Sequence, residues 1–159
     1  MMEQLQRDRE RRAAEQAGGR QAARPEASAR PSVNLVAARA VAAGLVVATG
    51  AIHLYLYRDG FSAVPTIGRL FLANFVVGVV LGLAILLRGR VGWSILGAGF
   101  CLATLAGFLI SVHWGLFGYR ETLSGAWQER AAVVEIAGAI ACAVVAVWAL
   151  RTRPRHSLV

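Results

Sequence analysis

The sequence contains no lysine and few charged residues of any kind. Only 16% of its 159 residues are charged, whereas soluble domains carry about 25% charge. Hydrophobic residues make up 57% of the chain, which excludes most classes of soluble protein. The net charge of +8 is due entirely to arginine. Seven arginines lie in the first 30 residues and most others separate apolar runs, a pattern typical of membrane proteins, so we expect no nucleic-acid partner.

Cysteine is equally scarce, and its placement excludes several kinds of site. Cys101 and Cys142 stand far apart inside apolar segments, without the spacing of a zinc site or a disulfide framework. We interpret both as small packing residues, because free cysteine is commonly buried. The sequence also lacks a G-x-S-x-G elbow, a phosphate-binding P-loop and an H-E-x-x-H motif. Because these catalytic motifs are absent, we favour a non-enzymatic protein.

Four long apolar runs dominate the rest of the chain. A run of about 20 apolar residues is long enough to cross a hydrocarbon core of ~30 Å as a helix, and a helix satisfies its own backbone hydrogen bonds in lipid. The fold class predicted is therefore all-α, a four-helix transmembrane bundle spanning residues 33–151. The runs lie at about residues 35–55, 64–87, 92–117 and 131–150.

The arginine distribution predicts the orientation of the bundle. Residues 1–32 are polar and read as a disordered, Arg-rich cytoplasmic leader, and residues 152–159 form a short tail. The leader, the turn after the second run and the tail carry twelve arginines on one side of the membrane. The opposite side carries Arg58, Arg120 and Arg130. By the positive-inside rule both termini are cytoplasmic, and the exclusive use of arginine suggests the cytoplasmic membrane of a bacterium with a GC-rich genome.

Small residues predict where the helices touch. Lipid gives no hydrophobic drive for helix association, so close contacts in membranes are enriched in glycine and alanine. The second run contains Gly78-x-x-x-Gly82. In the fourth run, a stripe of small residues and Glu135 is predicted to face the bundle, and a stripe of Val and Ile to face lipid. The inward stripe is Ala131, Ala132, Glu135, Gly138, Ala139, Cys142 and Ala146, and the outward one is Val133, Ile136, Ile140, Val144 and Val147.

Five polar residues stand out as candidates within the apolar runs, namely His53, Arg69, Asn74, His113 and Glu135. Ionisable groups inside a membrane are costly and mark functional hypotheses. At ~1.5 Å of rise per residue, four of the five lie roughly 6–9 Å below the same ends of four different helices, with Asn74 deeper. We therefore predict one buried polar cluster in the outer half of the bundle.

The chemistry of this cluster allows several interpretations. A structural one pairs Arg69 with Glu135 and gives the histidines hydrogen bonds, because isolated charges in the membrane are unfavourable. On that ground Glu135 is expected to be paired or neutral. A second assigns His53, His113 and Glu135 to haem b or a transition metal, although no cofactor is firmly assigned. A third interpretation is a pathway for protons or ions past Glu135, but no polar residue continues such a pathway along the fourth run.

Three stretches carry a resemblance to a known group of proteins. They are His53-Leu-Tyr-Leu-Tyr57, Pro65-Thr-Ile-Gly-Arg-Leu-Phe-Leu-Ala-Asn74 and Gly115-Leu-Phe-Gly-Tyr-Arg-Glu121. As a set, covering about residues 50–121, they resemble uncharacterised actinobacterial four-helix integral membrane proteins. The resemblance implies a four-span fold and no particular activity.

Three functional hypotheses follow. The favoured one is a non-enzymatic accessory or scaffold subunit in the cytoplasmic membrane, with the lipid bilayer, another membrane protein or a second copy of the chain as partner. The alternatives are a membrane redox protein using His53, His113 and Glu135 to bind haem or a metal, and a small oligomeric transporter.

Overall fold

The protein is an all-α bundle of four long helices. The computed structural model describes residues 33–122 and 126–152, with residues 1, 4 and 6 of a separate N-terminal unit. The predicted leader and tail therefore fall almost wholly outside the described residues. The helices are α2 (Val33–Arg58), α3 (Pro65–Arg88), α4 (Val91–His113) and α5 (Ala126–Arg151), with one 3-10 turn, η1 (Phe61–Ala63). Each of the four is long and apolar enough to span a membrane.

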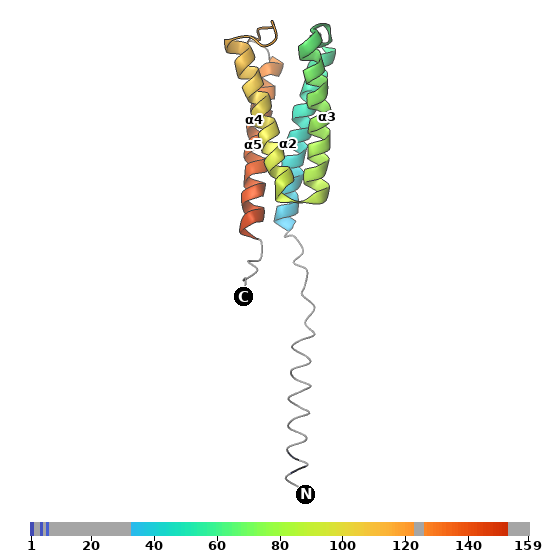
Figure 1. The fold of residues 1–159 in the computed structure, drawn as a ribbon, viewed down its shortest axis with the longest axis vertical. Coiled ribbons are helices and arrows are strands. Elements are labelled where there is room, and N and C mark those ends of the chain that lie inside the picture. Colours follow the sequence, from blue (N-terminus) through green and yellow to red (C-terminus); the bar gives the residue numbers. More distant parts are fainter. Residues whose placement is uncertain (2–3, 5, 7–32, 123–125, 153–159) are drawn as a thin grey trace. The chain divides into compact units, whose positions relative to one another are not determined.

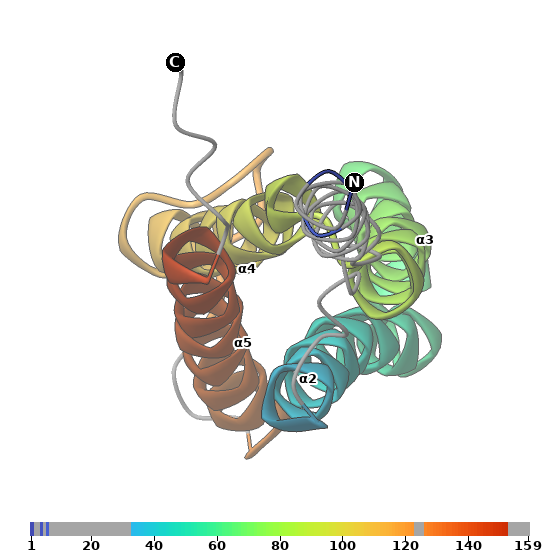
Figure 2. The same ribbon diagram turned by 90° about the horizontal axis from the view of Figure 1, so that it is seen from below.

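Successive helices run in opposite directions, so the bundle has two distinct ends (Figure 1). We call the end with the connections 59–64 and 114–125 the loop end. The opposite end, where α2 begins, α3 turns into α4 and α5 finishes, is the terminal end. Viewed along the axis, the helices follow one another around the bundle in chain order (Figure 2). Helix α2 packs closely on α3 and α5, and α4 on α5, whereas α3 and α4 touch much less and diverge towards the loop end (Figure 1).

Two helix boundaries differ by four or five residues from those expected. The third run was predicted to continue to residue 117, but α4 ends at His113. The chain leaves the helix there because Gly115 and Gly118 adopt φ angles of 83° and 80°, in the left-handed region that glycine tolerates. At the other end of this connection, α5 begins at Ala126, five residues before the predicted start at 131, so part of the expected surface turn is helical.

Glycines close the seam between α2 and α3. A Cβ atom on Gly50 would lie 3.1 Å from the carbonyl oxygen of Phe75, and one on Gly78 would lie 3.0 Å from that of Val46. One on Gly82 would collide with the Val47 side chain. The predicted Gly78-x-x-x-Gly82 motif therefore faces α2, and the two backbones approach as closely as small residues allow.

Cysteines and glycines form a reciprocal contact between α4 and α5. The Cys142 sulfur lies 3.0 Å from the position of a Cβ on Gly97, and the Cys101 sulfur lies 2.9 Å from that of a Cβ on Gly138. Both thiols are free and buried, as expected for packing residues. They belong to the main apolar core of Ala42, Ala43, Val46, Leu81, Ile85, Cys101, Ala139, Cys142 and Val145.

The two predicted stripes of α5 have the expected orientation. Glu135, Gly138, Ala139 and Cys142 are buried, while the Val and Ile stripe is exposed at the surface of the bundle, from 48% at Ile136 to 65% at Val133. A surface of branched aliphatic side chains suits lipid and not water, which agrees with a helix that spans the membrane.

Candidate functional site

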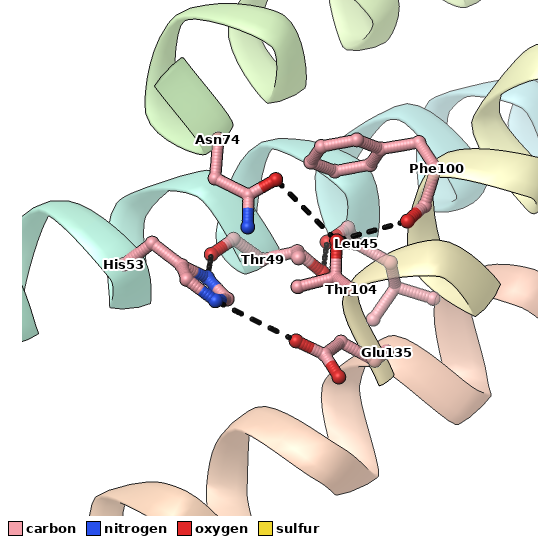
Figure 3. A network of polar contacts seen from close by, with 7 residues as sticks. All are labelled: Leu45, Thr49, His53, Asn74, Phe100, Thr104 and Glu135. Carbon is pink, nitrogen blue, oxygen red and sulfur yellow. Dashed lines mark hydrogen bonds and ion pairs between the residues drawn. The ribbon is translucent and has the colours of Figure 1, made fainter. Parts of the chain in front are cut away.

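A buried pair of ionisable side chains joins α2 to α5. The Nε2 atom of His53 lies 3.9 Å from Oε1 of Glu135, and both side chains are almost fully buried. Figure 3 shows the two side chains pointing towards one another across the bundle. Because an isolated charge is very unfavourable inside a membrane, the pair is expected to carry one proton and no net charge.

The backbone fixes the ring of His53. Its Nδ1 atom lies 2.8 Å from the carbonyl oxygen of Thr49, one helical turn earlier. A carbonyl oxygen can only accept, so Nδ1 carries a hydrogen and donates it. The Phe71 ring packs nearly perpendicular to the imidazole, with the ring centroids 4.9 Å apart. The orientation of His53 is thus set from two sides, and Nε2 is the nitrogen that faces Glu135.

One oxygen of Glu135 lacks a partner. The residue is 1% exposed, and Oε2 is a buried atom without a hydrogen-bond donor among the described residues. Nearly all buried polar atoms are hydrogen-bonded, so an unsatisfied carboxyl oxygen needs an explanation, such as a bound molecule.

The other two helices contribute a polar pair at the same level. The hydroxyl group of Thr104 on α4 donates to the backbone oxygen of Phe100 at 2.9 Å and lies 3.4 Å from Oδ1 of Asn74 on α3. Asn74, Thr104 and Glu135 each lie nine residues from the loop end of their helices. Together with His53 they form what we call the polar ring, with one member from each helix (Figure 3).

The four residues of the polar ring line a cavity whose walls come mainly from α3 and α4. The cavity has a volume of about 340 Å³, within the range of small-molecule sites, which begins near 300 Å³. Its walls are mainly apolar and include three phenylalanine rings. The wall residues are Leu70, Phe71, Ala73 and Val77 from α3, and Phe100, Ala103, Gly107 and Phe108 from α4.

The connection between α4 and α5 forms the rim of the cavity. Tyr119, Glu121 and Gln128 line it there, and Gln128 Nε2 donates to Glu121 Oε1 at 3.5 Å. Burial, with the nearby Glu121 carboxylate, raises the pKa of Tyr119 above its usual value, so the phenol stays neutral at physiological pH. No arginine contributes to the described lining, and the rim is acidic.

Arg69 and His113 do not join the polar ring. Both side chains are exposed, so the predicted five-residue buried cluster needs correction and the predicted pair of Arg69 with Glu135 is absent. Arg69 follows the buried Ile67 by two residues, and His113 follows the buried Ser111 by two. Two residues correspond to about 200° around a helix, so both side chains point away from the interior.

The three proposed metal ligands are therefore not brought together. His53 and Glu135 face one another, but His113 lies on the outside of α4 and its backbone oxygen accepts a hydrogen bond from Arg120 at 2.7 Å. Among the described residues, no group of three or more His, Cys, Asp or Glu side chains is placed to hold a metal ion.

Sequence reasoning overlooked the apolar and acidic parts of the site. A signal for the cavity face of α4 is present in the sequence, since Thr104, Gly107 and Ser111 recur at helical spacing. Sequence reasoning did not identify the phenylalanine walls, because phenylalanine is common in any apolar run. It also did not identify Glu121 as a rim residue, since only the fold of the connection brings it to the cavity.

No protein-family model, no curated protein and no solved structure matches the chain.

Proposed function

We propose that this protein is a non-enzymatic, multi-pass membrane protein that binds a small molecule in the cavity between α3 and α4. The observation that carries the proposal is the convergence of four polar side chains, one from each helix, on a mainly apolar cavity of about 340 Å³. Apolar cavities with a few convergent polar groups are the usual form of small-molecule sites.

The packing below the polar ring favours binding over passage. Towards the terminal end the interior is filled by Val46, Ile85, Cys101 and Val145, each no more than 2% exposed. A solute crossing the membrane would have to separate this core. A binding site closed on one side fits the accessory role that the sequence favours better than the transporter hypothesis.

The walls indicate that the molecule reaches the site from the bilayer. Leu70 and Val77 line the cavity and are each 43% exposed. Both lie on α3, which has only a loose contact with α4. A ligand dissolved in the membrane can therefore enter between α3 and α4 without unfolding a tight contact.

We further propose that the terminal end faces the cytoplasm of a bacterial cell. Arg39, Arg88, Arg90 and Arg151 lie at or near this end, and the positive-inside rule assigns the more basic side to the cytoplasm. The cavity then lies in the half of the membrane away from the cytoplasm. A periplasm-dependent reporter fused after Val159 should stay inactive, and an active reporter would reverse the orientation.

A photoreactive probe tests the binding site. The protein in lipid nanodiscs is irradiated with a small neutral aromatic diazirine, and the labelled residues are identified by mass spectrometry. We expect labelling to concentrate on cavity residues such as Phe100 and Phe108. Gly107→Leu should abolish this labelling, because Gly107 lines the cavity and the space beside it is open.

Gly99 on the same helix supplies a matched control. It also has open space beside it, but it is exposed and lies outside the cavity lining. Gly99→Leu should therefore leave the labelling unchanged. Equal labelling of cavity residues in wild type and Gly107→Leu, or labelling confined to lipid-facing residues such as Val80 and Leu102, would contradict the proposal.

A further inference from the structure

The cavity combines an unsatisfied carboxyl oxygen with aromatic walls. Glu135 Oε2 is buried and has no donor among the described residues, and Glu135, Phe71, Phe100 and Phe108 all line the cavity. A carboxylate supplies a full negative charge, and the faces of aromatic rings attract cations within about 6 Å of the ring centroid. Aromatic rings of this kind are a common means of binding quaternary ammonium groups.

The charge of the lining discriminates against anions. Arg69 is the arginine of α3 that lies nearest in sequence to the cavity residues. Its side chain is exposed and does not line the cavity. The rim carries the additional carboxyl group of Glu121. A phosphate or fatty-acid head would meet the Glu121 carboxylate at the rim, and no arginine in the described lining would compensate it, which is costly in a low-dielectric site.

We infer that the ligand is an organic cation with an apolar body, which binds beside Glu135 and displaces the proton shared with His53. This inference rests on the proposed function and names the ligand class of the same cavity. An apolar body lets the ligand partition into the bilayer and pass between α3 and α4. Its cationic head then takes the place of the proton as the partner of the Glu135 carboxylate.

The exchange conserves charge whichever residue holds the proton beforehand. If the proton is on Glu135, it leaves as the cation arrives, and if it is on His53 Nε2, it leaves from there. In each case one proton is released for each cation bound, while Nδ1 of His53 keeps its hydrogen bond to Thr49. The other titratable groups near Glu135 are Cys101 from α4, which interacts with it electrostatically, and Tyr119 and Glu121 at the rim. The described lining from α3 contains no titratable group.

Calorimetry with two isosteric probes tests the inference. Benzyltrimethylammonium is a permanent cation, and neopentylbenzene has the same shape without the charge. The full chain in nanodiscs should bind the cation and release one proton, measured by titration in buffers of different ionisation enthalpy. While the pair holds its proton, affinity should rise about tenfold per pH unit by linkage. An affinity for the cation that does not change with pH would overturn the inference.

Variants locate the site. Glu135→Gln should weaken cation binding by at least about tenfold, because the charged partner is lost, and Phe108→Leu should weaken it about two- to fivefold through lost ring contact. Glu129→Gln, on the exposed face of α5, removes the same charge elsewhere and should leave affinity unchanged. If Glu135→Gln does not fold, the proton release and pH dependence of the wild-type protein decide the question.

The outcomes separate the two proposals. If the neutral isostere binds as tightly as the cation, without proton release, the cavity is a binding site but the cation inference is wrong. If neither probe binds but the diazirine still labels cavity residues, again only the inference fails. If the diazirine also labels no cavity residue, both proposals fail.

Discussion

The seams of the bundle are of two kinds. Between α2 and α3, and between α4 and α5, glycines bring the backbone of one helix against the side chains or backbone of the next. Between α3 and α4 the contact is loose, and phenylalanines with a single nearby glycine, Gly107, enclose a cavity. The comparison shows that the size of the residues at a helix–helix contact decides whether two apolar helices pack closely or leave a cavity between them.

The closed seams should be the more sensitive to added volume. Gly50→Leu would drive a side chain into the Phe75 and Asn74 backbone atoms, which lie 3.1–3.3 Å from the position of its Cβ. Overpacking of this kind lowers the free energy of unfolding by about 1–3 kcal/mol. We expect Gly50→Leu at the upper end of this range, because the atoms that its side chain would meet belong to the backbone and cannot move aside. Reversible unfolding in mixed micelles measures the loss. Gly44→Leu, on the same helix with no atom within 4 Å, should be nearly neutral, and equal losses in both variants would refute the closed seam.

The polar ring should contribute the next largest effect. His53→Leu removes the partner of Glu135 and the donor to Thr49, and is expected to destabilise the protein by about 1–2 kcal/mol, the range of interhelical polar contacts in membranes. Combining it with Glu135→Leu should recover part of this loss, because no polar group is then left unpaired. His113→Leu, at an exposed position, serves as the control. Strictly additive losses for the two ring substitutions would mean that the side chains do not interact.

The contact between α3 and α4 across the open seam should be weaker. Thr104→Val removes a hydroxyl group that lies 3.4 Å from Asn74 Oδ1, and should cost about 0.6 kcal/mol, the average for such contacts. Thr66→Val, on the exposed start of α3, should cost less. A loss above ~2 kcal/mol in the same unfolding experiment would show that α3 and α4 are held together more tightly than the structure indicates.

The loose contact between α3 and α4 should tolerate a larger side chain. Gly107→Leu places a side chain in the cavity, with no atom within 4 Å of its Cβ, so the unfolding free energy should change by less than about 0.5 kcal/mol. The same variant should lose cavity labelling, which separates the effect on binding from any effect on folding. A destabilisation as large as that of Gly50→Leu would mean that the seam is already filled.

The sequence predicted the fold well because the membrane leaves few alternatives. Run length and the need to satisfy backbone hydrogen bonds determine four helices, and the small residues of α5 locate its inner face. The end of α4 was misplaced, because an apolar run continues past the left-handed Gly115 into residues 116 and 117. Hydropathy alone does not reveal where a helix ends within an apolar segment.

The composition of the polar ring was harder to predict. Depth along a helix follows from residue count, but direction around it changes by ~100° with each residue. His53 and Glu135 lie on stripes with other small or polar residues, which indicates an inward face. His113 has Leu109 and Ile110 at helical spacing, which indicates an outward face, and it is exposed. Arg69 is exposed although Thr66 and Ala73 lie at that spacing, so neither depth nor a stripe predicts its direction. The cavity emerges only from the divergence of α3 and α4.

The contact between His53 and Glu135 is the most direct test of the whole account. Solid-state NMR of the protein in bilayers, with ¹⁵N-labelled histidine and ¹³C-labelled glutamate, can detect it through space. The structure, with Nε2 and Oε1 3.9 Å apart, predicts a cross-peak from the Glu135 carboxyl carbon to His53 Nε2, together with a protonated Nδ1. Assignment of that carboxyl contact to Arg69 or His113 instead, with none to His53, would contradict it.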